Sequence, residues 1–522
     1  MADPNFRPLA HRMVDFVADY LEDIERYPVL SRASPGALFN ALPSDAPVDG
    51  MLQPPPHYGN GPGENNINIG ALPHTPPAPA SGAFFDALAA DLHSLIMPGI
   101  THWQHPQFYA YFSANTSTPA ILGEILSAGL GVQGMLWATS PACTELEQRM
   151  MNWLGKAIGL PSKFLFAEQN ISGQTGLPTG GGVIEGTASE STLVALLAAR
   201  ERANRRATPD DFHRPMVVYA SSQAHSSVTK AAMIAGIARG PADAAAVRLI
   251  PTDDQCRLDP VALSAAIRED ISNNKRPIFV AATVGTTGVT AVDPVPAIAH
   301  VLSTFPSPIW LHIDAAHSGA ACICPEFRWM LDGVEHADSI CMNPHKWLLT
   351  NFDCGCLWLA DPHEATAALS VTPEYLKNAA SDSGQVVDYR DWQIPLGRRF
   401  RSLKLWFVFR AYGISGLQSY IREHIRLAAL FESWVSADER FEVTNQRTVN
   451  LVCFRLRSGD TDTATLMNAV NQSGRAYLTH TILPPTAKIA SGALVLRLAI
   501  SGTATTQAHL TQTWDLIRTY AP

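Results

Sequence analysis

The feature that most constrains the fold is an alternation of short apolar runs with helix-like stretches in the middle of the chain. Continuous apolar runs bounded by turn residues are typical of strands buried on both faces, and the stretches between them have helical spacing. This alternation predicts a mostly parallel sheet covered by helices. The expected strands are residues 216–220, 277–283, 308–314 and 339–342, and the expected helices are residues 191–202 and 260–271.

Three further regions flank this central part. Residues 10–27 carry apolar side chains at helical spacing, and this stripe has to be buried against the rest of the chain or a second subunit. Residues 43–82 are rich in proline and glycine and predict a linker or long surface loop. A second, smaller α/β domain is expected near the C-terminus, with strands at 451–456 and 494–500. The expected organisation is an N-terminal helical and dimerisation segment over 1–117, a large domain over 118–403 and a small domain over 404–522.

The composition excludes several classes of protein. Lysine and arginine number 38 against 47 aspartates and glutamates, and a net charge of −9 argues against nucleic acid as the main partner. No apolar run approaches the roughly 18 residues that a transmembrane helix needs, so no membrane association is expected. The first residues lack a basic segment followed by an apolar one, so no secretory signal is expected.

The 8 cysteines are scattered and form no CxxC pair, which fits a reducing compartment and predicts a cytoplasmic protein. Two CxC pairs occur, Cys322 with Cys324 and Cys354 with Cys356. They lack the spacing of a metal site, so we expect buried small apolar residues and no metal.

Candidate chemistry lies just after the expected strands, because ligands of α/β sheets bind at the carboxyl ends of the strands. Asp314 ends one strand, Lys346 shortly follows the next, and His225 follows a third. Residues 180–190 lead into a helix beginning near Ser189, where free N–H groups and small side chains suit an anion. Pyridoxal phosphate requires such a lysine, acid and anion site.

Each of these features also has an ordinary structural explanation. A lysine after a strand is usually solvated, an aspartate at a strand end is often a turn or cap residue, and a glycine triplet is often a flexible turn. A single histidine is more often structural than catalytic. The hypothesis therefore depends on the combination and on its order along the chain.

Longer motifs carry a resemblance to a known family. Asn343-Pro344-His345-Lys346-Trp347 resembles the lysine motif of the group II pyridoxal-phosphate-dependent decarboxylases. The segments that resemble the aromatic-L-amino-acid decarboxylase branch are residues 140–147, 312–316, 323–328 and 388–404. The resemblance covers residues 84–520 closely and 7–42 loosely. It implies the aspartate-aminotransferase-like fold (fold type I), with a large domain whose mostly parallel sheet is of the seven-stranded type, and a homodimer with its active site at the subunit interface.

The resemblance also assigns roles to individual residues. Lys346 resembles the Schiff-base lysine, Asp314 the partner of the pyridinium nitrogen, and His225 the histidine that stacks on the cofactor ring. Tyr375 resembles the tyrosine on a mobile loop that returns a proton to Cα of the substrate. The cofactor-binding residues implied are Ala188, Ser189, His225, Thr287, Asp314, Ala316, Ser339, Asn343, His345 and Lys346.

The substrate pocket is less completely matched. Gly397 leaves more room than a serine would, which favours an indole or catechol ring. His317 replaces a tyrosine next to the Asp314 motif, and no role follows for it. The substrate-binding residues implied are Trp103, Tyr111, Phe112, Ala114, Gln133, Met135, Gly397 and Arg497.

The resemblance therefore predicts decarboxylation of aromatic L-amino acids to arylalkylamines and CO2. A competing hypothesis is an aldehyde synthase on the same scaffold. Relatives of that kind carry phenylalanine where this chain has Tyr375, so Tyr375 and His225 favour amine production. A decarboxylase of another L-amino acid, such as glutamate, and a cofactor-binding protein without catalysis also stay open. The presence of both Lys346 and Asp314 argues against the last.

Overall fold

The computed structural model describes residues 6–44, 46, 81–167, 180–485 and 492–522. Most of the expected linker over 43–82 lies outside these residues. The chain divides into two compact units, Met1–His105 and Pro106–Pro522.

The N-terminal unit contains the helix predicted for residues 10–27. Helix α1 begins earlier than predicted and spans Phe6–Glu22, and a short 3-10 turn, Ile24–Arg26, continues it. It contacts α3 (Ser81–Asp91), while α2 spans Ala37–Ala41. None of the residues of α1 is buried, so its apolar stripe is only partly covered within the chain.

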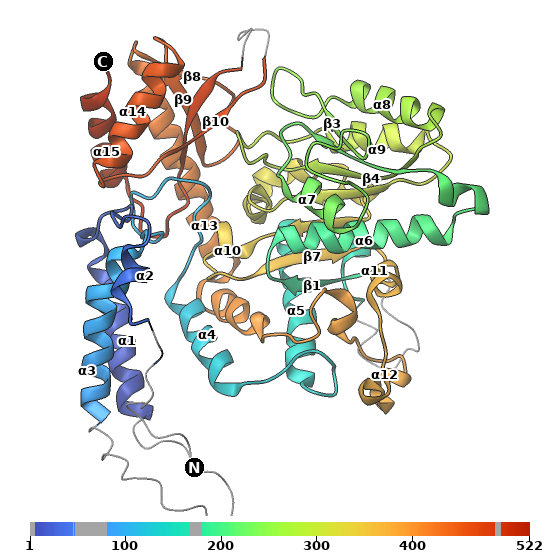
Figure 1. Cartoon of the computed structure of the whole chain (residues 1–522), viewed down its shortest axis with the longest axis horizontal. Helices are drawn as coiled ribbons and strands as arrows, with labels where there is room; N and C mark the ends of the chain where they lie inside the picture. The colour runs from blue at the N-terminus through green and yellow to red at the C-terminus, as the bar shows by residue number, and fades with distance from the viewer. Residues whose placement is uncertain (1–5, 45, 47–80, 168–179, 486–491) are drawn as a thin grey trace, which may run out of the picture. The chain divides into compact units, whose positions relative to one another are not determined.

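The second unit is built on a seven-stranded mixed sheet in the order β1-β7-β6-β5-β4-β2-β3 (Figure 1). The parallel pairs are β2 with β3, β2 with β4, β4 with β5 and β5 with β6, whereas β7 runs antiparallel to both its neighbours. The strands are β1 Gly181–Glu185, β2 Met216–Ser221, β3 Val247–Ile250, β4 Arg276–Thr283, β5 Trp310–Asp314, β6 Ser339–Met342 and β7 Gly355–Leu359.

The four predicted strands of this sheet are confirmed as β2, β4, β5 and β6, with ends that differ by at most two residues. The glycine-rich run leads into a helix as predicted, since α6 begins at Ala188, but its first part forms strand β1, which was not predicted. A Cβ on Gly181 would lie 2.5 Å from Phe166, and one on Gly182 would lie 2.4 Å from Met151. These glycines are therefore required by close packing against the sheet, not by a turn.

Helices cover the sheet and connect its strands (Figure 1). The two predicted helices are confirmed as α6 and α8, and α6 contacts β4, β5, β6 and β7. The helices of this unit are α4 Thr118–Leu130, α5 Pro141–Ile158, α6 Ala188–Arg205, α7 Ser227–Ile234, α8 Pro260–Ser272, α9 Val295–Ser303, α10 Pro344–Trp347, α11 Pro362–Leu369, α12 Ala379–Asp382, α13 Arg401–Ala437, α14 Asp460–Gln472 and α15 Gln507–Tyr520.

A second, antiparallel sheet forms near the C-terminus in the order β10-β11-β9-β8. The two predicted strands are present as β9 and β11. Phe431 of α13 packs against Phe454 of β9 and Trp514 of α15. Residues 106–117 belong with this sheet, because the backbone of Tyr109 is hydrogen-bonded to Tyr477 and Ala499. The strands are β8 Phe441–Val443, β9 Leu451–Leu456, β10 Thr479–Ile482 and β11 Leu494–Ala499.

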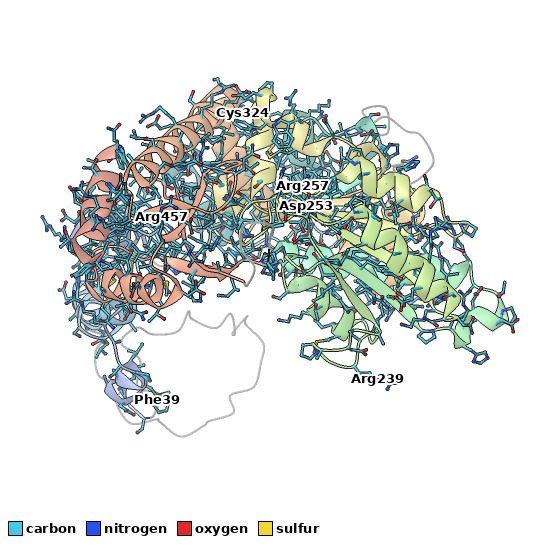
Figure 2. The ribbon with its side chains drawn as sticks, turned by 90° about the horizontal axis from the view of Figure 1, so that it is seen from above. Phe39, Arg239, Asp253, Arg257, Cys324 and Arg457 are labelled. Carbon is cyan, nitrogen blue, oxygen red and sulfur yellow. The ribbon has the colours of Figure 1, made fainter. Side chains whose placement is uncertain are left out.

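All eight cysteines are free and buried, which confirms the interpretation of the CxC pairs as core residues. Cys324, labelled in Figure 2, is fully buried. None of the described helices combines the length and the apolar character that a membrane span requires.

The contact between α4 and α13 provides a test of this packing. A Cβ on Gly123 of α4 would lie 2.6 Å from Cα of Lys404 in α13, a distance that backbone movement alone can relieve. We expect Gly123→Ala to lower the free energy of unfolding by about 1–3 kcal/mol. Gly240 has open space around its Cβ position, so Gly240→Ala is the control and should change stability by less than about 0.5 kcal/mol. Denaturant unfolding of both variants makes the comparison, and equal effects would contradict this account of the packing.

Candidate active site

Parallel register brings polar side chains into one row at the carboxyl edge of the sheet. Thr283 at the end of β4 pairs with Asp314 at the end of β5, which in turn pairs with Cys341 of β6. Lys346 follows β6 within the short helix α10. The N-terminus of α6, at Ala188, follows β1 on the same sheet.

A cavity of about 220 Å³ lies at this edge. Nine of the ten predicted cofactor-binding residues line it, and the tenth, Ser339, does not. The lining residues are Phe112, Thr187, Ala188, Ser189, His225, Thr283, Gly285, Thr287, Asp314, Ala316, His317, Asn343, His345, Lys346 and Phe352.

Lys346 and Asp314 are the charged residues of the cavity lining. Burial lowers the pKa of Lys346, and the nearby Asp314 carboxylate partly opposes this shift. A lowered pKa favours the neutral, nucleophilic amine. Asp314 is 6% exposed, and its Oδ1 accepts a hydrogen bond from the Ala316 N–H at 3.0 Å.

The N-terminus of α6 is held to the segment that carries Lys346. Oδ1 of Asn343 accepts a hydrogen bond from the Ala188 N–H at 3.0 Å. The N-cap residue Thr187 makes no side-chain capping bond, and a Cβ on Gly355 would lie 2.9 Å from the Thr187 backbone. The helix start therefore stays close to the strand behind it and presents its N–H end to the cavity, which favours an anion.

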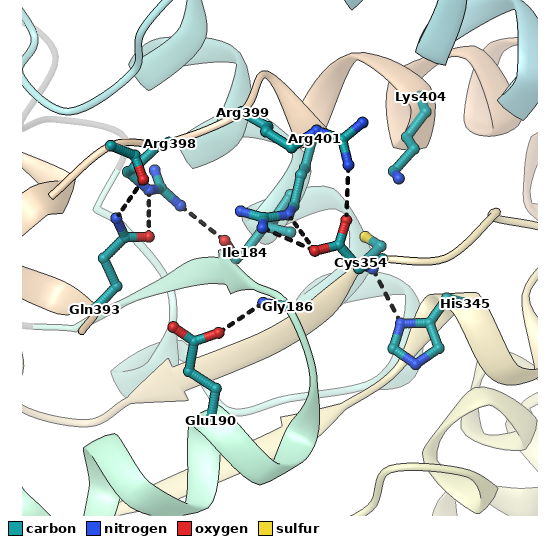
Figure 3. A network of polar contacts seen from close by, with 12 residues as sticks. Ile184, Gly186, Glu190, His345, Cys354, Gln393, Arg398, Arg399, Arg401 and Lys404 are labelled. Atoms are coloured by element: carbon teal, nitrogen blue, oxygen red, sulfur yellow. Dashed lines mark hydrogen bonds and ion pairs between the residues drawn. The ribbon is translucent and has the colours of Figure 1, made fainter. Parts of the chain in front are cut away.

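The neighbouring polar network fixes the backbone that follows Lys346 (Figure 3). Nδ1 of His345 accepts a hydrogen bond from the Cys354 N–H at 3.0 Å, and burial lowers the pKa of His345 to about 3. Asp353 accepts hydrogen bonds from Arg401 at 2.8 Å and from Arg399 at 3.2 Å. These contacts connect the Lys346 segment to residues 388–404, one of the segments that carried the family resemblance.

Aromatic rings form a further part of the wall. Phe112 stacks on His317 with ring centroids 3.6 Å apart, and His317 stacks in turn on Trp347. Nε2 of His317 lies 2.8 Å from Oδ1 of Asn450, and burial lowers the pKa of His317 to about 3. His225 accepts a hydrogen bond from the Ser227 N–H at Nδ1, and burial also lowers its pKa. These histidines therefore act as neutral groups at neutral pH.

Residues 72–457 match the family described as the pyridoxal-dependent decarboxylase conserved domain. The chain belongs to the pyridoxal-dependent decarboxylase family. Pyridoxal 5′-phosphate is the cofactor of this family, and the cavity residues fit it. Lys346 offers an amine of lowered pKa, Asp314 offers a buried carboxylate, and α6 offers the N-terminus of an 18-residue helix for a phosphate.

Individual relatives of this pyridoxal-dependent decarboxylase confirm the resemblance to the aromatic-amino-acid branch and the expected fold. Tryptophan decarboxylase 2 of Oryza sativa subsp. japonica is 45% identical over 98% of this chain and 93% of that protein. Phenylacetaldehyde synthase of Arabidopsis thaliana is 44% identical over 99% of this chain and 96% of that protein. The crystal structure of Oryza sativa TDC with PLP and tryptamine has a TM-score of 0.86 at 39% identity, covering 100% of this chain and 99% of that chain.

One predicted cofactor residue, Ser339, lies away from the cavity. The hydroxyl of Ser339 lies at the start of β6, where it accepts a hydrogen bond from the Trp310 indole at 2.8 Å and lies 2.8 Å from Nδ1 of His312. The opposite end of β6 leads to the cavity. Ser339 therefore contacts the sheet interior and not the cavity of this decarboxylase.

The predicted substrate residues occupy several places. Phe112 lines the cavity, and Arg497 lies beside it, with its guanidinium 5.2 Å from the centre of the Phe112 ring. The side chain of Arg497 donates to the carbonyl of Gly288 and to the hydroxyl of Thr479, and burial lowers its pKa. Tyr111 is half-exposed, with its carbonyl accepting from Arg497.

The remaining predicted substrate residues do not line the cavity. Oε1 of Gln133 accepts a hydrogen bond from the Arg398 N–H at 3.1 Å and lies next to Gly397, and the carbonyl of Met135 accepts from Arg390. Trp103 belongs to the N-terminal unit, and Ala114 follows Phe112 in the chain without lining the cavity. Tyr375, the predicted proton donor, lies in a 3-10 turn, Glu374–Leu376, and is 75% exposed.

Sequence patterns do not single out four of the lining residues: Thr187, Thr283, Gly285 and Phe352. Thr283 could have been found, because it ends a predicted strand. Gly285 has φ +91°, and a Cβ there would collide with the Ser318 side chain, a constraint that appears only in three dimensions. Phe352 and Thr187 carry no sequence signal that separates them from ordinary loop residues.

Buried neutral histidines make a testable contribution to the pH dependence of stability. In the unfolded chain histidine has a pKa near 6.5, so below that value the unfolded state binds more protons than the folded state. The free energy of unfolding is therefore highest above about pH 6.5 and falls as the pH drops toward 4. The four histidines concerned have pKa values of about 3 for His317 and His345 and about 4 for His312 and His424.

We expect His424→Asn to reduce this pH dependence by about one proton, or about 1.4 kcal/mol per pH unit. His424 accepts a hydrogen bond from the Trp347 indole and lies outside the cavity lining, so the change tests titration rather than catalysis. Denaturant unfolding at pH 7, 6 and 5 measures the slope for both proteins. An identical slope in the variant would contradict the assignment of a buried neutral histidine.

Proposed function

We propose that this chain decarboxylates aromatic L-amino acids to the corresponding arylalkylamines and CO2. The observation that carries the proposal is the pairing of Lys346, whose pKa is lowered, with buried Asp314 in one cavity. Pyridoxal phosphate, when bound, supplies the electron sink that decarboxylation needs. Lys346 would hold it covalently, Asp314 would pair with its ring nitrogen, and the start of α6 would hold its phosphate.

An aromatic substrate is supported by the wall of the cavity and by the relatives. The stacked rings of Phe112 and His317 form an apolar surface beside Lys346, whose Nζ lies 5.9 Å from the centre of the Phe112 ring. Arg497 offers a cation beside the same ring. A tryptophan decarboxylase is among the similar proteins, and the absence of a side chain at Gly397 favours a bulky indole or catechol ring.

Tyr375 is the proposed proton donor to Cα of the substrate. Its side chain is 75% exposed, so its hydroxyl is available to a partner group. The similar proteins include both a decarboxylase and a phenylacetaldehyde synthase. Tyrosine at position 375 and histidine at position 225 favour the amine over the aldehyde.

The proposed assembly is a homodimer that shares its active sites. Gln133, Met135, Gly397 and Tyr375 do not line the cavity of their own chain, so a second copy would have to bring them to it. The outer side of α4 also exposes a row of apolar side chains, and an obligate dimer needs an apolar interface of this kind. These side chains are Leu122, Ile125, Leu126 and Leu130. A cytoplasmic location is proposed from the eight free thiols.

Product analysis tests the reaction and the role of Tyr375 together. The purified enzyme with added cofactor is offered tryptophan, DOPA, tyrosine, phenylalanine and glutamate, and amines, aldehydes and hydrogen peroxide are measured. We expect aromatic amines without peroxide, and aldehyde with peroxide from Tyr375→Phe. Faster turnover of glutamate would overturn the aromatic assignment, and an amine-only product from the variant would overturn the role of Tyr375.

A mixed dimer tests whether Tyr375 acts across the interface. Lys346→Ala and Tyr375→Phe chains carrying different tags are co-expressed, and the mixed dimer is isolated. Its only site with Lys346 would receive Tyr375 from the other chain, so we expect amine at about half the wild-type rate per dimer. Aldehyde from the mixed dimer would instead mean that Tyr375 serves its own chain.

A further inference from the structure

A chain of buried polar side chains lies behind Asp314, on the side away from the cavity. Sγ of Cys341 is 3.8 Å from Oδ1 of Asp314 and 3.6 Å from Nε2 of His312. Nδ1 of His312 is 2.8 Å from Oγ of Ser339, which accepts a hydrogen bond from Nε1 of Trp310 at 2.8 Å. All five side chains lie on the adjacent strands β5 and β6, and each is buried.

Two contacts of Ser339 set the direction of the hydrogen bonds along this series of side chains. The indole of Trp310 can only donate, so Ser339 Oγ accepts from it, and among the described residues Nδ1 of His312 is the acceptor within reach of the Ser339 hydroxyl hydrogen. We therefore assign the Ser339 hydroxyl as the donor to Nδ1 of His312. Burial lowers the pKa of His312 to about 4, so the ring is neutral and carries its single proton on Nε2. That N–H donates to Cys341, whose sulfur is thereby engaged as an acceptor.

The thiol hydrogen of Cys341 is left for Asp314. Burial raises the pKa of Cys341 well above its ordinary value, so the group is a thiol and not a thiolate. Oδ1 of Asp314 thus receives the thiol S–H and the Ala316 N–H, and both of these contacts fall on the same oxygen. Among the residues that the structure describes, Oδ2 has no hydrogen-bond partner, and Asp314 lines the cavity.

We propose that Trp310, Ser339, His312 and Cys341 are positioning residues that orient the Asp314 carboxylate through one directional hydrogen-bond chain. By holding Oδ1, the chain presents Oδ2 to the ring nitrogen of the bound cofactor. This inference rests on the proposed role of Asp314. It also gives a function to Ser339, which acts on the site from the far end of β6 without touching the cavity.

Variants at Cys341 separate hydrogen bonding from space filling. Cys341→Ala removes both the donor and the acceptor, whereas Cys341→Ser keeps both. We expect Cys341→Ala to lower kcat about fivefold with KM unchanged, to weaken cofactor binding and to shift the visible absorption band of the holoenzyme. Cys341→Ser should restore all three properties. An equal loss in both variants would mean that Cys341 only fills space, and would overturn the proposal.

Two further variants complete the test. Ser339→Ala breaks the hydrogen-bond chain two residues away from Asp314, so it should reproduce the effect of Cys341→Ala. The double variant Ser339→Ala/Cys341→Ala should lose no more kcat than the more affected single variant. Additive losses would overturn the proposal. Cys356→Ala is the matched control, because Cys356 is an equally buried cysteine on the neighbouring strand β7 and is not part of the hydrogen-bond chain to Asp314. Its kcat and absorption band should stay unchanged.

Neutron diffraction of the holoenzyme shows which atom carries each proton, so it checks the direction of the hydrogen bonds from Trp310 to Asp314 without reference to catalysis. We expect deuterium on Nε2 of His312 and on Sγ of Cys341, directed toward Asp314. Deuterium on Nδ1 of His312 would overturn the inference. Asp314→Asn separates this result from the role of Asp314 itself: if that variant leaves the absorption band unchanged, the proposed contact to the cofactor fails, whatever the proton positions are.

Discussion

The parallel pairing of β4, β5 and β6 is the constraint on which the rest of the site depends. Because parallel strands end at the same edge, Thr283, Asp314 and Cys341 form one row across three strands that are far apart in sequence. The connection from β6 to Lys346 is only a few residues long, so the lysine cannot leave this edge. Shifting the register of one strand by a residue would turn Asp314 toward the opposite face of the sheet.

Burial then decides the chemical character of the residues held at this edge. Removal from water lowers the pKa of Lys346 and of the histidines alike, so the amine gains nucleophilicity and the imidazoles lose their charge. The histidines are thus hydrogen-bonding and stacking groups with defined protonation, and Asp314 is the negative charge beside Lys346. A neutral surrounding would leave the attraction between this carboxylate and the ring nitrogen of a bound cofactor weakly screened.

The sequence predicts those parts of this fold and site that depend on local patterns. Strands β5 and β6 are continuous apolar runs that end at Asp314 and lead to Lys346, so the pattern reveals both their positions and their chemistry. Strand β1 escapes prediction because its glycines, which are required by Phe166 and Met151, resemble a turn. The family resemblance implies a place for Ser339 among the cofactor-binding residues, whereas the direction of β6 carries its side chain to the end of the strand away from the cavity.

In the proposed homodimer, a second group of site residues would come from the other chain. Lys346, Asp314 and the helix N-terminus are assembled by a single sheet, so one sequence and one chain are enough to bring them together. Gln133, Gly397 and Tyr375 lie on segments that no strand of this sheet directs toward the cavity. In the proposed homodimer, the residues that would hold the cofactor and those that would choose the ring and the product are therefore positioned by different means, the first by backbone register and the second by association of subunits. Under this proposal, exchange of one side chain in the second group would change the product while the first group, and with it the family, stays the same. Such a separation would account for the almost equal similarity of this chain to a tryptophan decarboxylase and to a phenylacetaldehyde synthase.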